Sequence, residues 1–259
     1  MNIFVTILVT LLAGLGAGLG TGFAGMSAAA VISPMLIAFL DVEPYMAVAI
    51  ALASDVLASA VSAKMYAKHR NIDLKRGLVL LVCVLSFTIV GSIVANYVPQ
   101  NSMEIIATAM TCLLGIRFIL WPVMAERKCP NCGDSRRCLI RVIISGIVIG
   151  FVCGFVGAGG GIMMLFALTT ILGYELKTAV GTSVFIMTFT ALTGSVAHIV
   201  IAGVPDLLIL GLCMSFTFVF ARIAAMIANR VSHKILNRVT GVVLVSLGTA
   251  IFIFSLIKG

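Results

Sequence analysis

The chain has 259 residues, of which 61% are hydrophobic and only 10% are charged, with a net charge of +8. Its mean hydropathy is +1.22. A soluble domain is about 45–50% apolar and about 25% charged, so this composition excludes a sizeable soluble domain, whose surface needs more charge. The long apolar runs also exclude an outer-membrane barrel, which has short segments of alternating polarity. The sequence therefore predicts an all-α, multi-pass protein of the lipid bilayer.

Apolar runs divide the chain into ten segments. In chain order they cover residues 3–19, 26–40, 44–63, 77–98, 102–124, 139–156, 162–172, 178–202, 207–229 and 235–257. The runs 26–40 and 162–172 are short, at about 22 Å and 16 Å of helix, against a hydrocarbon core of about 30 Å. Each short run and its predecessor could be two spans or one re-entrant hairpin. The prediction is thus ten spans, or eight full spans plus two hairpins.

Two glycine-rich windows, 14–25 and 146–161, indicate an internal duplication. At a constant offset of 132 residues, one row of glycines falls on another: Gly14, Gly18, Gly22 and Gly25 on Gly146, Gly150, Gly154 and Gly157. Glu43 then matches Glu175 and, after one inserted residue, Asp73 matches Asp206. We expect two transmembrane repeats of about five segments each, 1–124 and 139–259, joined by a cytoplasmic linker, 125–138.

The basic residues predict how the two repeats sit in the bilayer. Since five is odd, the repeats should insert in opposite senses. The loop 64–76 holds five Lys or Arg, whereas its counterpart 196–209 holds none. Short cytoplasmic loops collect Lys and Arg, so the +8 charge reflects topology and requires no nucleic-acid partner. This rule places 14 of the 17 Lys and Arg on the cytoplasmic side and both termini on the outer side. The membrane is expected to be the plasma membrane.

The tighter glycine runs, 20–25 and 157–161, predict a break in each helix, because each helical Gly costs about 1 kcal/mol relative to Ala. The spacing of four along the rest of each window is instead typical of close helix packing. Broken backbone in a bilayer is tolerated where it is buried in protein or lines a cavity. Paired breaks in inverted halves point to a transporter's substrate site, and freed N–H groups favour an anion. The candidate binding residues are Gly22, Gly25, Ser27, Gly157, Gly159, Gly160 and Gly161.

These motifs resemble those of the TauE/SafE family of sulfite and organosulfonate exporters. The resemblance rests on the glycine-rich hairpin, on Pro34 after it, on Ala179-Val180-Gly181-Thr182-Ser183 in the second half, and on the duplicated layout. It implies a transporter of small, often sulfur-containing anions, and it adds Thr182 and Ser183 to the candidate binding residues. The first half departs from the motif, since Ala49-Ile50-Ala51 stands in its place, which predicts an asymmetric site.

Two charged residues inside predicted spans are further candidates, because such charges cost roughly 2.5–3.5 kcal/mol on insertion scales. Asp55 lies about 16 Å of helix beyond Pro44. It could relay protons, bind a coupling ion, or be a structural carboxylate bonded to Ser54, Ser59 or an Arg. Arg222 lies about 12 Å of helix before Arg230, deeper than snorkelling readily explains, and is a candidate partner of the anion.

Three cysteines of the linker, Cys129, Cys132 and Cys138, resemble half of a zinc knuckle. The loop itself lacks a fourth ligand, which His69 or His233 would have to supply. Unliganded cytosolic thiols are the simpler interpretation, so no metal and no other cofactor is expected.

The sequence favours a secondary carrier of a small anion, not an enzyme, that works by alternating access. A proton-coupled mechanism, which the sequence leaves open, would use Asp55. The sequence leaves open whether the protein forms a homodimer. Two alternatives also stay open: a cation or metal permease that uses Asp55, and a membrane thiol–disulfide electron carrier built on the buried cysteines. The chain is too short to hold a nucleotide-binding domain besides its spans, and it has no phosphate-binding GxxxxGK[ST] sequence.

Overall fold

The computed structural model describes residues 3–95, 116, 119–120, 135–156, 160–203 and 205–258, and every element in this part is an α-helix. The helices are α1 (Ile3–Ala24), α2 (Ala29–Phe39), α3 (Pro44–Lys68), α4 (Leu74–Ala95), α6 (Ser135–Val156), α7 (Gly160–Thr170), α8 (Leu176–Ala202), α9 (Leu207–Arg230) and α10 (His233–Lys258). The all-helical prediction is confirmed for these residues.

Four of the described helices are long and apolar enough to cross a bilayer: α1, α3, α9 and the stretch Leu176–Val200 of α8. The two short helices, α2 and α7, have 11 residues each, or about 16 Å, where the sequence predicts short segments. The predicted span 102–124 lies outside the described residues except at positions 116, 119 and 120. The fold is that of a polytopic membrane protein.

Acidic residues fix the starts of several helices. The Glu43 side chain accepts a hydrogen bond of 3.2 Å from the backbone N–H of Met46 at the start of α3. Pro44 takes the first position of that helix, where a missing N–H is no loss. Asp206 accepts a bond of 2.8 Å from the N–H of Leu208 and so caps α9. These caps let long apolar helices begin directly after short polar turns.

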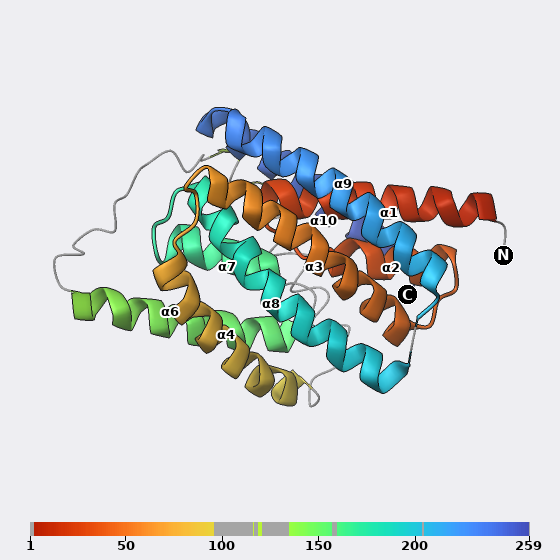
Figure 1. The fold of residues 1–259 in the computed structure, drawn as a ribbon, viewed down its shortest axis with the longest axis horizontal. Helices are drawn as coiled ribbons and strands as arrows, with labels where there is room; N and C mark the ends of the chain where they lie inside the picture. Colours follow the sequence, from red (N-terminus) through yellow and green to blue (C-terminus); the bar gives the residue numbers. More distant parts are fainter. Residues whose placement is uncertain are drawn as a thin grey trace.

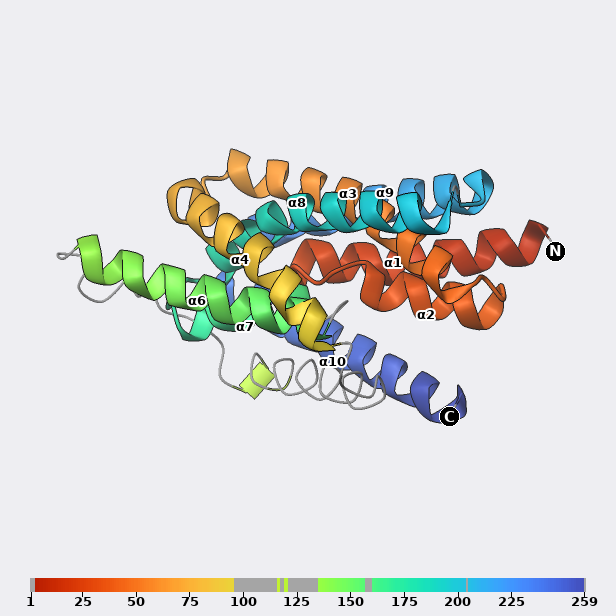
Figure 2. The same cartoon turned by 90° about the horizontal axis from the view of Figure 1, so that it is seen from below.

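The long helices α3 and α8 lie side by side (Figure 1). On one side α9 packs against α1 and α3, and on the other α4 packs against α6. Both views place the N-terminus and the end of α10 at the same end of the molecule, together with the α2–α3 connection (Figures 1 and 2). The α3–α4 connection lies at the opposite end.

Rows of glycine allow two of these helix pairs to approach closely. A Cβ added at Gly18 of α1 would lie 2.6 Å from the Cβ of Phe220 in α9. A Cβ at Gly146 of α6 would lie 2.6 Å from the Cβ of Cys83 in α4. The neighbouring glycines at four-residue spacing, Gly14, Gly22 and Gly150, meet the facing helix in the same way. The spacing of four thus serves close packing, as the sequence predicts.

This packing predicts opposite effects of two Gly→Ala substitutions. Gly18→Ala should lower the melting temperature of the detergent-solubilised protein, because overpacking a tight contact costs about 1–3 kcal/mol. Gly211→Ala is the matched control, since Gly211 of α9 has nothing within 4 Å of its added Cβ. It should leave the melting temperature unchanged or raise it, because Ala favours the helix by about 1 kcal/mol. A Gly18→Ala protein as stable as the wild type would contradict the assigned packing.

Candidate functional site at the helix breaks

The break after α1 is shorter than the glycine run predicts. Helix α1 continues through Gly20 and Gly22 to Ala24, and only residues 25–28 separate it from α2. Gly22 stays helical because it packs against α9, where its added Cβ would lie 2.4 Å from the Cβ of Ala224. Gly25 has φ +61°, a left-handed conformation that favours glycine and ends helices. In the second half α7 begins at Gly160, and Gly157 and Gly159 lie outside the described residues.

Hydroxyl groups from several helices bond to the carbonyl groups freed at the end of α1. The Tyr66 hydroxyl of α3 donates to the Gly22 carbonyl at 2.9 Å, and Thr240 of α10 donates to the Phe23 carbonyl at 3.0 Å. Beyond the helix end, the Met26 carbonyl accepts a bond of 2.8 Å from the Thr21 hydroxyl. All three donors are buried. The break is therefore a built feature whose polar backbone is paired inside the protein.

The start of α7 lies directly against this break. A Cβ added at Gly161 would lie 2.5 Å from the carbonyl oxygen of Gly25 and 2.9 Å from the backbone N of Ser27, so no larger residue fits there. The Ser183 hydroxyl of α8 donates to the same Gly25 carbonyl at 3.3 Å. Four of the predicted site residues, Gly25, Ser27, Gly161 and Ser183, thus meet at one buried point.

Asp55 joins this group from α3. Its side chain is 1% exposed, and the Ser27 hydroxyl donates to its Oδ2 at 2.7 Å. The same hydroxyl accepts a bond of 3.3 Å from the backbone N–H of Ala29, the first residue of α2. Within the described residues, Oδ1 of Asp55 has no hydrogen-bond partner.

The sequence also allows Asp55 to be a structural carboxylate bonded to Ser54 or Ser59, and these two partners are wrong. Ser54 donates to the carbonyl of Ile50, and Ser59 donates to the backbone carbonyl of Asp55. Both hydroxyls thus bond back along their own helix, as Ser and Thr commonly do. The carboxyl group is held instead by Ser27, 28 residues earlier in the chain.

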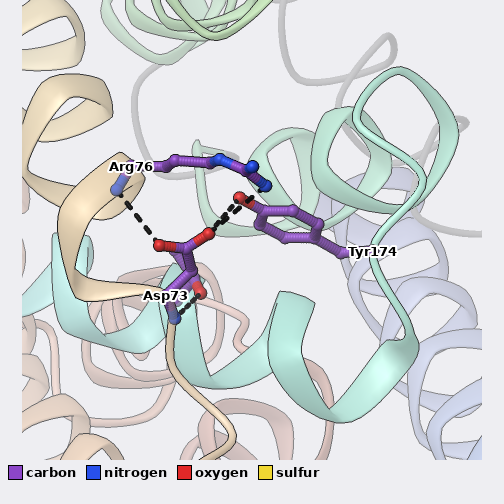
Figure 3. Close-up of polar contacts among 4 residues, drawn as sticks. Asp73, Arg76 and Tyr174 are labelled. Carbon is purple, nitrogen blue, oxygen red and sulfur yellow. Dashed lines mark hydrogen bonds and ion pairs between the residues drawn. The ribbon is translucent and has the colours of Figure 1, made fainter. Parts of the chain in front are cut away.

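Thr182 belongs to a second polar cluster, at the end of the molecule where α3 joins α4. Its hydroxyl accepts a bond of 3.2 Å from the backbone N–H of Asp73. The Asp73 carboxylate accepts a bond of 2.9 Å from the Tyr174 hydroxyl and pairs with Arg76 at 3.5 Å (Figure 3). Burial raises the pKa of Tyr174, so this phenol keeps the proton that it donates.

Two further contacts join connections at the same end. The Asn71 side chain donates to the Asn229 side chain at 2.7 Å. Lys177 donates to the carbonyl groups of Asn229 and Val231 at 3.1 Å and 2.8 Å, as basic side chains do at helix C-termini. The connections after α3, α7 and α9 are therefore bonded to one another.

The structure leaves other candidates outside this group. Arg222 has an exposed side chain on α9 and does not belong to the buried cluster around Asp55. Cys129 and Cys132 lie outside the described residues, as does the side chain of Cys138. Among the residues that are described, no group of three or more His, Cys, Asp or Glu could hold a metal ion.

Sequence reasoning missed several residues that build the site. Tyr66, Tyr174 and Thr240 act through contacts with segments distant in the chain. Met187 of α8 approaches Gly161, whose added Cβ would lie 2.8 Å from its sulfur. The available signal for Tyr66 and Thr240 is a polar group in an otherwise apolar helix, which needs a partner once buried.

A buried carboxyl group beside the break after α1 and the start of α7, in a bundle of membrane-spanning helices, defines a membrane protein with a polar interior site, as transporters have. The family described as "Sulfite exporter TauE/SafE" matches residues 10–251. The chain belongs to this family.

Two relatives from Bacillus subtilis (strain 168) agree with this assignment. The chain is 25% identical over 249 residues to "Probable membrane transporter protein YunE", which covers 86% of this chain and 89% of that protein. It is 23% identical over 215 residues to "Probable membrane transporter protein YdhB", which covers 83% and 87%. No solved structure matches the chain. The chain is thus a membrane-embedded transporter.

The contact between the break after α1 and the start of α7 predicts unequal effects of removing two hydroxyl groups from α8. Ser183→Ala leaves the Gly25 carbonyl without this donor and should destabilise the protein by about 1–3 kcal/mol, with loss of transport. Thr188→Val is the control, because its hydroxyl bonds back to Val184 in the same helix, and it should stay close to wild type. Melting temperature and transport in proteoliposomes measure both effects. Equal losses in the two variants would count against a special role for Ser183.

Proposed function

We propose that the chain is a secondary carrier of small anions, sulfite, sulfonates and related sulfur-containing or organic anions foremost, by alternating access. The observation that carries this proposal is the meeting of two helix starts, those of α2 and α7, at one buried point. The N-terminus of a helix carries the positive end of its dipole, which favours an anion. The hydroxyl groups of Ser27 and Ser183 and the Gly-lined backbone would complete the site. The family description supports the substrate class.

We also propose that the two halves, 1–124 and 139–259, are inverted repeats joined by the linker 125–138. Equal helix lengths support this, since α1 and α6 have 22 residues each and α2 and α7 have 11 each. The packing supports it too: α1 lies on α9 through its glycines, and α6 lies on α4 through glycines at the matching positions. Repeats of this kind place the substrate near the bilayer midplane, at their interface.

We propose that the protein lies in the plasma membrane with the α3–α4 connection in the cytoplasm and both termini on the outer side. The loop 64–76, with its five basic residues, supports this orientation through the positive-inside rule. The cluster of Asp73, Tyr174 and Thr182 then closes the cytoplasmic end of the carrier. Release of a substrate to the cytoplasm would require these bonds to open.

One observation favours a cation as an alternative cargo. The Oδ1 atom of Asp55 lacks a partner among the described residues, and a carboxylate oxygen is a ligand for hard cations. By contrast, the described free cysteines give no support to an electron carrier: Cys83 packs on Gly146 of α6, whereas Cys213 is buried in α9. Transport assays distinguish anion from cation directly.

The anion proposal predicts counterflow in proteoliposomes. Vesicles loaded with unlabelled sulfite, thiosulfate, a sulfonate or a small carboxylate should accumulate the labelled anion, because a carrier exchanges substrate across the membrane without a net gradient. Vesicles without protein and vesicles that carry Ser183→Ala are the controls. No counterflow of any anion, together with uptake of a metal cation that Asp55→Asn abolishes, would establish the cation permease instead.

The cytoplasmic cluster predicts a local effect of Tyr174→Phe. Loss of the bond to Asp73 removes about 1 kcal/mol of stabilisation, so amide exchange in the segment 69–76 should become about fivefold faster. Hydrogen–deuterium exchange with mass spectrometry measures this. Tyr45→Phe is the control, since Tyr45 stacks on His198 through its ring and lies on the α2–α3 side of the bundle. Unchanged exchange at 69–76 in Tyr174→Phe would exclude this cluster as a closure.

A further inference from the structure

The start of α2 already holds an ionisable group. The carboxyl group of Asp55 accepts a hydrogen bond from the Ser27 hydroxyl, which in turn accepts one from the N–H of Ala29. The helix dipole stabilises a negative charge at this position. This is the same environment that the proposed function offers to the transported anion.

The second half differs at the corresponding place. Met187 stands 132 residues after Asp55, and it is Met187 that approaches Gly161 at the start of α7. One helix start therefore carries an ionisable carboxyl group, whereas the other faces a neutral thioether. The two starts adjoin, because the added Cβ of Gly161 would lie 2.9 Å from the backbone N of Ser27.

We propose that Asp55 is a resident anion of this site, which occupies the start of α2 when ionised and admits a substrate anion only when it carries a proton. The inference rests on the proposed function and assigns the regulation of the same site. Two negative charges in one buried site repel each other strongly, so the ionised carboxylate and the substrate exclude each other. Proton and anion then bind together, and each transport cycle moves both.

Few other charges act on Asp55. The helices packed on α3 are α1, α2, α8 and α9, and α1 and α2 contain no titratable side chain. In α8 and α9 the titratable or charged groups are Lys177, His198, Cys213, Arg222 and Arg230. Lys177 is held by the carbonyl groups at the end of α9, His198 stacks on Tyr45, and the two arginines are exposed. Cys213 is buried in α9. On α3 itself, Tyr66 donates to Gly22, Tyr45 lies at the first turn, and Lys64 and Lys68 lie in the last two turns.

Anion binding to the purified full-length protein tests the inference. The probes are ethanesulfonate and thiosulfate, which stay ionised throughout the pH range used, and affinity is measured by isothermal titration calorimetry. For the wild type, affinity should fall by up to about tenfold per pH unit as the pH rises through the range in which Asp55 loses its proton. Asp55→Asn should bind with the same affinity across this range and bind at least about tenfold more tightly than the wild type at the upper end.

Two further variants make the result specific. Asp206→Asn removes a carboxylate from the exposed start of α9 and should keep the wild-type pH profile. Ser27→Ala keeps the charge of Asp55 but removes its donor, so the carboxyl group should take up a proton more readily and the profile should move to higher pH. A residue with only a structural role would change affinity equally at every pH. Ser27→Ala also decides the matter if Asp55→Asn does not fold.

The contrary outcomes are distinct. Wild-type binding that does not vary with pH, weaker binding by Asp55→Asn at every pH, or an unshifted profile in Ser27→Ala overturns the inference and leaves the anion carrier standing. Failure of the wild type to bind or exchange any anion at any pH overturns the proposed function as well.

Discussion

The structure depends on one constraint: backbone that leaves a helix inside a bilayer must find its hydrogen-bond partners within the protein. An unpaired polar group in hydrocarbon costs several kcal/mol. At the end of α1 this requirement is met by hydroxyl groups, from Tyr66 to Gly22, from Thr240 to Phe23 and from Ser183 to Gly25. Each donor comes from a different helix, α3, α10 and α8. The break is consequently the point at which distant parts of the chain are tied together.

This arrangement limits how the protein can move. The hydroxyl groups that hold the break cannot be withdrawn without leaving buried carbonyl groups unpaired, so the break should stay intact while the surrounding helices rock. The contacts near the α3–α4 connection are different, because Asp73 and Arg76 are partly exposed and water can replace their bonds. In the proposed carrier, alternating access is therefore most economically placed at this polar end, around a fixed centre formed by the break after α1 and the start of α7.

The sequence predicts well those features that depend on residues close together along the chain. The four-residue spacing of Gly14, Gly18 and Gly22 indicates a close helix contact, and the structure has one. The short helices and the position of Asp55 in a buried helix follow from length and hydropathy in the same way. The sequence places the break after α1 too early in the chain. The contact of Gly22 with Ala224 keeps α1 helical through its glycines. This partner lies about 200 residues away, so it leaves no trace in the local sequence.

The site itself could be predicted only in part, for a related reason. Ser27 and Ser183 stand out beside the glycine runs, but the bond from Ser27 to Asp55 joins two helices, and neither residue's neighbours specify it. Ser54 and Ser59 are nearer in sequence and were the obvious partners, yet a helical hydroxyl reaches its own backbone most easily. The depth of Arg222 in its predicted span makes it a candidate anion ligand. The direction of its side chain, however, depends on which face of α9 packs against α1 and α3.

If the two halves are the repeats proposed above, charge balance gives a reason why the described part of the site holds one carboxyl group, that of Asp55, and none at Met187. Each helix start contributes the equivalent of about half a positive charge, so the starts of α2 and α7 together offer about one unit. Ionised Asp55 neutralises that unit, and the empty site then carries little net charge in a medium where charge is costly. Protonation of Asp55 restores the positive unit, which matches a monovalent anion. A second carboxylate in place of Met187 would leave the site negative and repel the substrate, whereas no carboxylate at all would leave a positive site that tends to retain its anion. The asymmetry between Asp55 and Met187 thus suits a site that must both bind and release.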